Sequence, residues 1–158
     1  MTSLKLAGAL ALAVTLFAAP ALAIDTGGED TTSTSPAPVV KKPAAPTLAV
    51  ARSDIDASNW SKALADLKLI VAANPQSADA YNLMGFTYRN MGNYDRAGQA
   101  YAKALKLNPK HTGALEYQGV LFIKLGQLDK ARANLDKIKA ICGTTCEPYT
   151  DLAKELGG

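Results

Sequence analysis

Chemically reactive side chains are scarce in this chain of 158 residues, which has one histidine, His111, and two cysteines. A catalytic histidine needs a nucleophile or an acid within hydrogen-bond reach, and no Ser or Cys motif indicates such a partner for His111. No glycine-rich loop follows a strand pattern, so the usual phosphate cradle is excluded. Apart from the two cysteines, the sequence therefore offers no residues for a catalytic, cofactor or metal site. We interpret His111 as an exposed residue of a turn.

An excess of one charge is also lacking. The chain has 17 Lys and Arg against 14 Asp and Glu, and the two signs are interspersed. A nucleic-acid-binding protein normally concentrates basic residues in one stripe, so we expect no nucleic-acid partner. Asp54 and Asp56 are two residues apart and would not face each other on a helix, so we interpret them as helix-start charges rather than an acid pair.

Only the N-terminus carries a long apolar run, Leu6–Ala19, with Lys5 before it and Ala21–Ala23 after it. A positive start, an apolar run and a small-residue site are typical of a signal peptide, here residues 1–23, cleaved after Ala23. We therefore expect a periplasmic or secreted protein without membrane insertion after cleavage. The alternative is an uncleaved anchor, since the run nearly reaches the roughly 17–25 residues that span a bilayer.

The next segment, residues 24–47, is rich in Thr, Ser and Pro and has almost no large apolar side chains. Such a composition buries too little surface to offset the entropy lost on ordering. We expect a disordered linker here. It would let the folded part stand away from a neighbouring molecule.

Three similar pentapeptides begin at Asn59, Asn93 and Gln127, so 34 residues separate each from the next. Asn74-Pro75 and Asn108-Pro109 recur at the same step. A fixed period of this size indicates stacked structural repeats, which form extended grooves.

Each repeat reads as two helices. Tyr81, Gly85 and Tyr88 share one face of a first helix, and Gly92 can adopt the left-handed conformation that ends it. A second apolar stripe ends at Asn108-Pro109, because proline cannot continue the hydrogen-bond ladder. Small residues at Gly85 and Ala97 would let the two helix axes approach closely.

These residues resemble the tetratricopeptide repeat. The second unit fills every motif position with Tyr81, Met84, Gly85, Tyr88, Ala97, Tyr101, Ala104 and Pro109. The third unit carries Leu115, Gly119, Phe122, Ala131, Leu135 and Ile138, but has Gln118 for Leu and Gly143 for Pro. The first unit has a good second helix around Trp60, Ala63, Leu67, Ile70 and Pro75, but a poor first one, with Pro46, Asp54 and Asp56.

The resemblance implies an all-α fold, a short right-handed superhelix of helix pairs with a C-terminal capping helix. We predict a repeat domain over residues 48–158, with a partial repeat (48–77), two full repeats (78–111 and 112–143) and a cap (147–156). The cap has an apolar face, Tyr149, Leu152, Ala153 and Leu156, and a terminal repeat needs such a cover.

Cys142 and Cys146 lie just before this cap. In the oxidising compartment that a signal peptide implies, a disulfide is the expected state, with Gly143–Thr145 breaking the helix so that the sulfurs can meet. It would clamp the cap onto the last repeat. Two alternatives remain open, a redox-active dithiol and a thiolate site for Cu(I).

In such a stack the first helix of each pair lines the concave side. The non-packing positions there are the predicted protein-binding residues: Asn82, Phe86, Arg89, Asn90, Glu116, Val120, Ile123 and Lys124. An apolar centre with polar surroundings suits a peptide or helix laid in a groove. One family variant clamps a terminal carboxylate, but Leu83, Phe86, Gly113 and Tyr117 occupy several of the required places, so we reject that clamp.

We therefore predict a periplasmic interaction module that binds a protein or peptide partner without a cofactor. The alternatives are a thiol-redox or copper-handling protein that uses the cysteine pair, and a structural subunit of an envelope assembly. In the last case the partial first repeat would be completed by another chain, including a second copy of this one.

Overall fold

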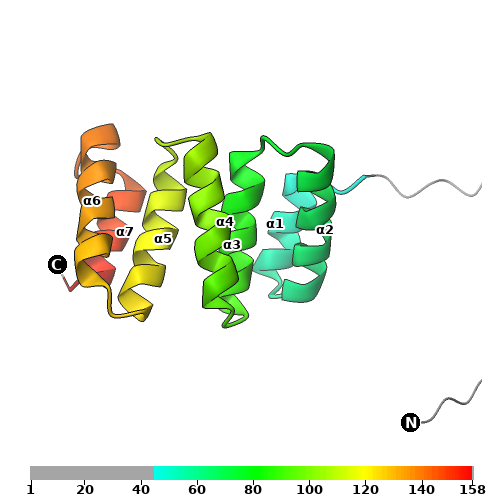
Figure 1. Cartoon of the computed structure of the whole chain (residues 1–158), viewed down its shortest axis with the longest axis horizontal. Helices are drawn as coiled ribbons and strands as arrows, with labels where there is room; N and C mark the ends of the chain where they lie inside the picture. Colours follow the sequence, from blue (N-terminus) through cyan, green and yellow to red (C-terminus); the bar gives the residue numbers. More distant parts are fainter. Residues whose placement is uncertain (1–44, 158) are drawn as a thin grey trace, which may run out of the picture. The chain divides into compact units, whose positions relative to one another are not determined.

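The computed structural model describes residues 45–157, which fold into helices joined by short loops (Figure 1). The predicted signal peptide and all but the last three residues of the predicted linker lie outside the described residues. The helices are α1 (Leu48–Asp56), α2 (Trp60–Ala73), α3 (Ala78–Asn90), α4 (Tyr94–Leu107), α5 (Thr112–Lys124), α6 (Leu128–Cys142) and α7 (Glu147–Glu155). Residues 45–157 contain no strand, and none of their helices has the length and apolar character needed to cross a membrane.

The helices stand side by side in chain order, and each pair packs mainly against its neighbours (Figure 1). α1 and α2, α3 and α4, and α5 and α6 form the three pairs, and α7 closes the end against α5 and α6. The predicted all-α stack of helix pairs is confirmed.

The turns within and after the pairs follow from a few residues. Gly92 has a φ of +75° after the end of α3, and Gly143 has a φ of +83° after the end of α6. L-residues with side chains rarely adopt this conformation, so glycine is required at both helix ends. Asn93 then begins α4 by accepting a hydrogen bond from the Arg96 N–H at 3.3 Å, which satisfies one free donor of the first turn.

The first helix corrects our interpretation of its aspartates. Asp54 and Asp56 lie in the last turn of α1, so they are not helix-start charges. Asp54 is buried and accepts a hydrogen bond from Lys62 Nζ of α2 at 2.5 Å, and Asp66 lies 3.5 Å from the same nitrogen. The hydrogen bond to Asp54 raises the pKa of Lys62. A buried charge is tolerable when it is paired, so the position that looked unsuited to packing joins α1 to α2.

The main core runs from α1 to α5, and Tyr101 of α4 is its largest fully buried side chain. Its ring passes beside Gly85 of α3 so closely that a Cβ on Gly85 would lie 2.5 Å from ring carbons. Only a glycine leaves room for the ring at this helix contact. The motif pair Gly85 and Tyr101 therefore sets how closely α3 and α4 pack.

In the third pair, α5 and α6, the positions equivalent to Gly85 and Met84 make different contacts. A Cβ on Gly119 would lie 2.6 Å from a methyl carbon of Leu152, so this glycine admits α7 rather than the second helix of its own pair. Gln118, which departs from the motif, accepts a hydrogen bond from buried Asn134 Nδ2 at 3.0 Å. The same nitrogen donates to the Leu115 carbonyl at 3.0 Å. A hydrogen-bonded polar pair thus replaces the apolar pair Met84 and Ala100 of the second unit.

His111 is not the exposed turn residue that we predicted. It is the N-cap of α5, where its Nδ1 accepts from the Ala114 N–H at 3.2 Å, and its side chain is only 14% exposed. Its Nε2 lies 3.1 Å from Asp79 Oδ1 of α3. Since Nδ1 is an acceptor, the proton is on Nε2 and is donated to Asp79. His111 therefore links two successive repeats.

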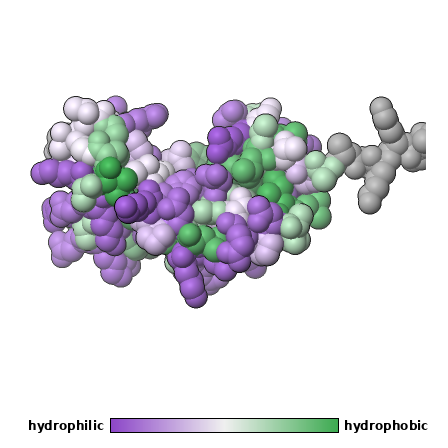
Figure 2. Space-filling view, turned by 90° about the horizontal axis from the view of Figure 1, so that it is seen from above, coloured by the Kyte–Doolittle hydropathy of each residue, from purple (hydrophilic) through white to green (hydrophobic). Residues whose placement is uncertain are grey.

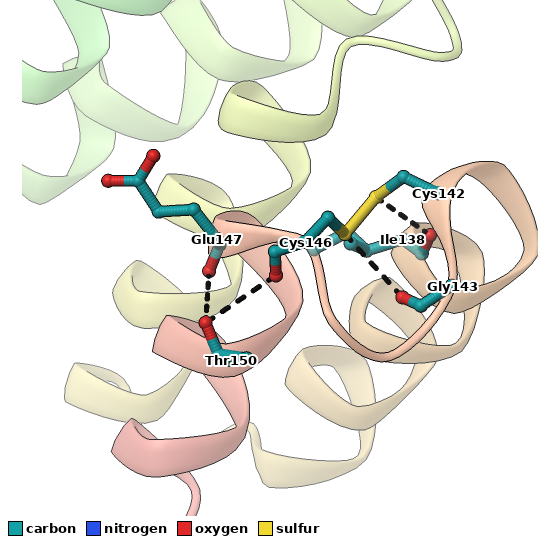
Figure 3. The surroundings of a disulfide bond; sticks show 6 residues. All are labelled: Ile138, Cys142, Gly143, Cys146, Glu147 and Thr150. Atoms are coloured by element: carbon teal, nitrogen blue, oxygen red, sulfur yellow. Dashed lines mark hydrogen bonds between the residues drawn. A yellow bond between two sulfur atoms is a disulfide. The ribbon is translucent and has the colours of Figure 1, made fainter.

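A disulfide joins Cys142 at the end of α6 to Cys146 just before α7 (Figure 3). The loop between them contains the predicted break at Gly143, and Pro148 lies in the first turn of α7, where a missing N–H costs nothing. Leu152 of α7 is fully buried against Leu115 and Ile138. The bond thus holds α7 at the point where it begins to cover the last pair.

Candidate functional site

The first helices of the pairs line one side of the stack. α1 contacts α3, α3 contacts α5, and α5 contacts α7, so these four helices form a continuous surface. Seen from the edge at which these helices begin, the outline is indented between the two ends of the stack (Figure 2). A pocket of about 350 Å³ lies on this side. Its lining is Arg52, Ile55, Asp56, Asn82, Leu83, Phe86 and Tyr117, from α1, α3 and α5. We call this the groove pocket.

Aromatic rings form part of the surface beneath the groove. The Phe86 ring centroid lies 5.0 Å from that of Tyr117 and 6.4 Å from that of Trp60. The Arg89 guanidinium lies over the rings of Phe86 and Tyr117, at 5.2 and 5.6 Å from their centroids. Tilted rings and a stacked guanidinium attract one another, so this cluster is held in place before any ligand arrives.

Asn82 supplies an unsatisfied polar atom at the groove pocket. The residue is 7% exposed, and its Oδ1 has no hydrogen-bond partner among the described residues. A buried acceptor without a partner costs roughly 1–3 kcal/mol, which is seldom retained without a use. A backbone N–H of an extended peptide is a donor of the right kind, and peptide recognition commonly uses main-chain hydrogen bonds.

Carboxylates dominate the other half of the groove, between α5 and α7. Burial, together with the negative charges of Asp151 and Glu147, raises the pKa of Glu116 to about 7, and the nearby Arg89 partly opposes this effect. Burial also raises the pKa of Tyr117, and the charge of Glu116 adds to the effect. Glu116 therefore changes its charge near neutral pH.

A second pocket, of about 410 Å³, lies further along the same helices toward their C-terminal ends. Its lining is Arg89, Asn90, Gly92, Tyr94, Val120, Lys124 and Glu155. Arg89 lines this pocket and contacts the aromatic cluster of the groove pocket, so the two adjoin. Together they provide an extended surface rather than one enclosed cavity, as a peptide ligand requires.

The predicted binding residues fall into two groups. The structure brings Asn82 and Phe86 to the groove pocket, and Arg89, Asn90, Val120 and Lys124 to the second pocket. Ile123 and Glu116 line neither pocket. Ile123 packs against the second core cluster, and Glu116 lies near Arg89, Glu147 and Asp151. Our assignment of Phe86 to non-packing positions is wrong, because the ring also packs against the main core cluster. A Phe86→Ala change would therefore lower stability as well as binding.

Sequence reasoning missed Arg52, Asp56 and Tyr117 in the groove pocket. A signal for the first two was present, since a step of 34 residues back from Phe86 and Asn90 leads to Arg52 and Asp56. The poor helix pattern of the first unit concealed them. Glu147 and Asp151 carried the same signal, since a step of 34 residues forward from Gly113 and Tyr117 leads to them, but α7 was interpreted only as a cap.

The arrangement suits recognition of a peptide by shape, stacking and charge. The described His, Cys, Asp and Glu side chains form no group of three that could hold a metal ion. Cys142 and Cys146 are paired with each other in the disulfide and line neither of the two pockets. The groove thus combines apolar and charged groups that suit binding.

Comparison with known proteins identifies the repeats. Tetratricopeptide repeat models match residues 78–111 and 114–141, so the predicted repeats are confirmed in these two segments. A tetratricopeptide repeat-containing protein of Methanocaldococcus jannaschii, MJ1428, is 33% identical over 66 residues. That match covers 40% of this chain and only 12% of the archaeal protein.

Solved structures show the same fold at low sequence identity. MamA superposes with a TM-score of 0.61 at 23% identity, over 70% of this chain and 65% of MamA. The type III secretion chaperone SycD of Yersinia enterocolitica, in complex with a peptide of the translocator YopD, superposes with a TM-score of 0.63 at 15% identity. That superposition covers 69% of this chain and 86% of SycD. The described part of the chain has the tetratricopeptide repeat fold.

Proposed function

We propose that this protein is an exported interaction module that binds an extended peptide segment of another protein in the groove of α1, α3, α5 and α7. The observation that carries the proposal is the buried Asn82 Oδ1, which has no partner and lies in a pocket with the rings of Phe86 and Tyr117. A peptide backbone would satisfy this oxygen, and its side chains would contact the rings. The solved SycD complex contains a bound peptide, which supports peptide binding as a use of this fold.

Replacing Asn82 with Leu tests the proposal. Leucine has the same branching and the same number of side-chain heavy atoms but no polar atom, so the variant loses the acceptor while removing an unsatisfied buried group. We expect its melting temperature to stay unchanged or rise, and its capture of partner proteins from an envelope extract to fall. An exposed change on α6, Lys137→Ala, is the matched control. Full capture by a folded Asn82→Leu variant would place binding elsewhere.

The export part of the proposal rests on residues 1–23 alone. If the segment is cleaved after Ala23, the intact mass of protein from native cells corresponds to a chain that begins with Ile24. The protein is then recovered from the periplasmic fraction or the medium. A mass that retains residues 1–23 would indicate an anchor instead.

Self-association through the first helix pair is a second candidate. Val50 of α1 is 44% exposed and Leu69 of α2 is 58% exposed, and apolar surface is visible at this end of the stack (Figure 2). No further helix among the described residues covers this end as α7 covers the other. Sedimentation velocity of the wild type and a Leu69→Glu variant distinguishes a dimer built on this surface from a monomer.

A further inference from the structure

Three carboxylates from two helices face the half of the groove between α5 and α7. Glu116 lies in the second turn of α5, and Glu147 and Asp151 are four residues apart on α7, so they share one face of that helix. The Glu147 side chain extends away from the disulfide (Figure 3). The ion pairs found in residues 45–157 join other groups, and none includes Glu116, Glu147 or Asp151.

Arg89 is the positive charge that acts on Glu116, and it does not neutralise the cluster. Its guanidinium is stacked on the rings of Phe86 and Tyr117, and it has no carboxylate within ion-pair distance among the described residues. With three carboxylates and one guanidinium, the local charge is negative when Glu116 is ionised. This half of the groove therefore attracts a cation.

An unpartnered polar atom gives an independent indication of a ligand. Asn82 is 7% exposed, and its Oδ1 has no hydrogen-bond partner among the described residues. It lies at the groove pocket, which adjoins this half of the groove through Phe86 and Tyr117. A backbone N–H of an extended peptide is a donor of the kind that this oxygen lacks.

We infer that the groove binds an extended peptide that carries a lysine or arginine, whose side chain lies between Glu116 and α7. The inference rests on the proposed function and specifies its ligand. The cation offsets the repulsion among Glu116, Glu147 and Asp151, while the peptide backbone supplies a donor for Asn82. Charge complementarity of this kind fixes which peptide binds and in which register.

Decapeptide arrays test the preference directly on the full-length protein. Each position in turn is fixed as lysine, as norleucine, which has a similar aliphatic chain without the charge, or as glutamate. We expect lysine to be enriched at one position. In solution, the selected lysine peptide should bind about tenfold more tightly than its norleucine counterpart by fluorescence anisotropy.

Charge-neutral variants identify the source of the preference. With Glu116→Gln and Asp151→Asn combined, the lysine peptide should lose about tenfold in affinity, whereas the norleucine peptide should change little. Asp129→Asn, on the exposed surface of α6, is the matched control and should leave both affinities unchanged. This comparison separates a charge effect from a general loss of folding, because a misfolded variant would bind neither peptide.

The preference should also depend on pH. Burial and its acidic neighbours raise the pKa of Glu116 to about 7, so protonation removes its charge as the pH falls from 8 to 6. Arg89 of α3 and Glu147 and Asp151 of α7 face Glu116, Tyr101 of α4 lies beneath it, and Tyr117 is adjacent on α5. We expect the advantage of lysine over norleucine to shrink over this range. Bound lysine peptide should in turn lower the pKa of Glu116, measured by NMR titration of its side chain.

The outcomes separate the inference from the proposed function. Peptides that bind in the groove without a basic preference would overturn the inference and leave the proposed function standing. A lysine preference that survives the double variant would also overturn it. If no peptide binds, or if sedimentation shows that a second copy occupies the groove, both proposals fail.

Discussion

A single methyl group is enough to distinguish the two glycines that the 34-residue step places in register. On Gly85 it would lie 2.5 Å from the rigid ring of fully buried Tyr101. On Gly119 it would meet the terminal methyl carbons of Leu152, which can rotate. We expect Gly85→Ala to lower the free energy of unfolding by about 1–3 kcal/mol and Gly119→Ala by less. Urea denaturation measures both, and a neutral Gly85→Ala would contradict the α3–α4 contact.

The polar pair in the third unit gives a second prediction. Asn134→Ala leaves the Gln118 oxygen and the Leu115 carbonyl without their shared donor, so we expect a loss of about 1–3 kcal/mol in the free energy of unfolding. Adding Gln118→Met recreates the Met84 and Ala100 pair of the second unit and should recover most of that loss. If the double variant is as unstable as Asn134→Ala, the hydrogen bonds are not what the third pair depends on.

The sequence predicted the role of a single residue correctly wherever the contacts that explain it lie within the same repeat. Tyr101 and Ala97 are fully buried, as expected from their motif places. It failed where the explaining contact comes from a residue distant in the sequence. Gln118 looked like a defect because its partner, Asn134, is 16 residues away, and His111 looked idle because Asp79 is 32 residues away.

Among the elements, α7 depends most on a single bond. The disulfide closes a short loop, so its removal should cost only on the order of 2 kcal/mol in the free energy of unfolding. With Cys142→Ser and Cys146→Ser, we expect a modest fall in melting temperature and unchanged binding of a peptide that does not contact α7. Mass spectrometry without reductant should show the two cysteines bonded in the wild type. Stoichiometric copper retention by the reduced protein would favour the copper-handling alternative instead.

Helix boundaries were predictable because the stop signals are local. Gly92 and Gly143 have the left-handed backbone conformation that follows a helix end, and Asn108-Pro109 follows the last residue of α4. That α1 packs as a regular first helix was not predictable in the same way. A charged residue, Asp54, stands in the sequence where an apolar packing residue is expected, and only its ion pair with Lys62 of α2 makes its burial acceptable.

At the scale of the whole domain, Glu116 should make stability depend on pH. Its ordinary pKa is 4.5 and the folded state raises it to about 7, so the folded protein holds this proton more tightly than the unfolded chain. This contribution favours folding below the ordinary pKa and is lost as the pH rises through 7. Glu116→Gln removes the effect. We expect the variant to be more stable than the wild type at pH 8, by on the order of 1 kcal/mol because water screens the half-exposed carboxylate, and equal to it at pH 4.

Urea unfolding at both pH values measures this difference. Asp129→Asn is again the control, since its carboxylate is fully exposed. A Glu116→Gln variant that loses stability at pH 8 would mean that the ionised carboxylate makes a favourable contact in the fold. That result would also remove the electrostatic support for a basic ligand.

The groove as a whole was only half predictable. The register placed Asn82, Phe86, Arg89 and Asn90 on the lining helix of the second unit. In the structure the first two line the groove pocket and the last two line the second pocket. It could not show that Asn82 would be buried without a partner, or that Phe86 would also support the core. The same register leads from Gly113 and Tyr117 to Glu147 and Asp151, but the interpretation of α7 as a cap hid them. The charge that we assign to the ligand depends on those two residues.

The two ends of the stack are secured unequally, and this should give the domain a direction of fraying. α1 is nine residues long and contacts only α2 and α3, whereas α7 is tied by a covalent bond and buries Leu152. In a repeat stack each unit depends on its neighbours, so transient opening should begin at α1 and spread inward. Amide hydrogen exchange should therefore be fastest in α1 and slowest toward the middle of the stack. Because Arg52 and Asp56 of α1 form one wall of the groove pocket, a ligand there would hold the fraying end closed, so binding would partly consist of completing the fold.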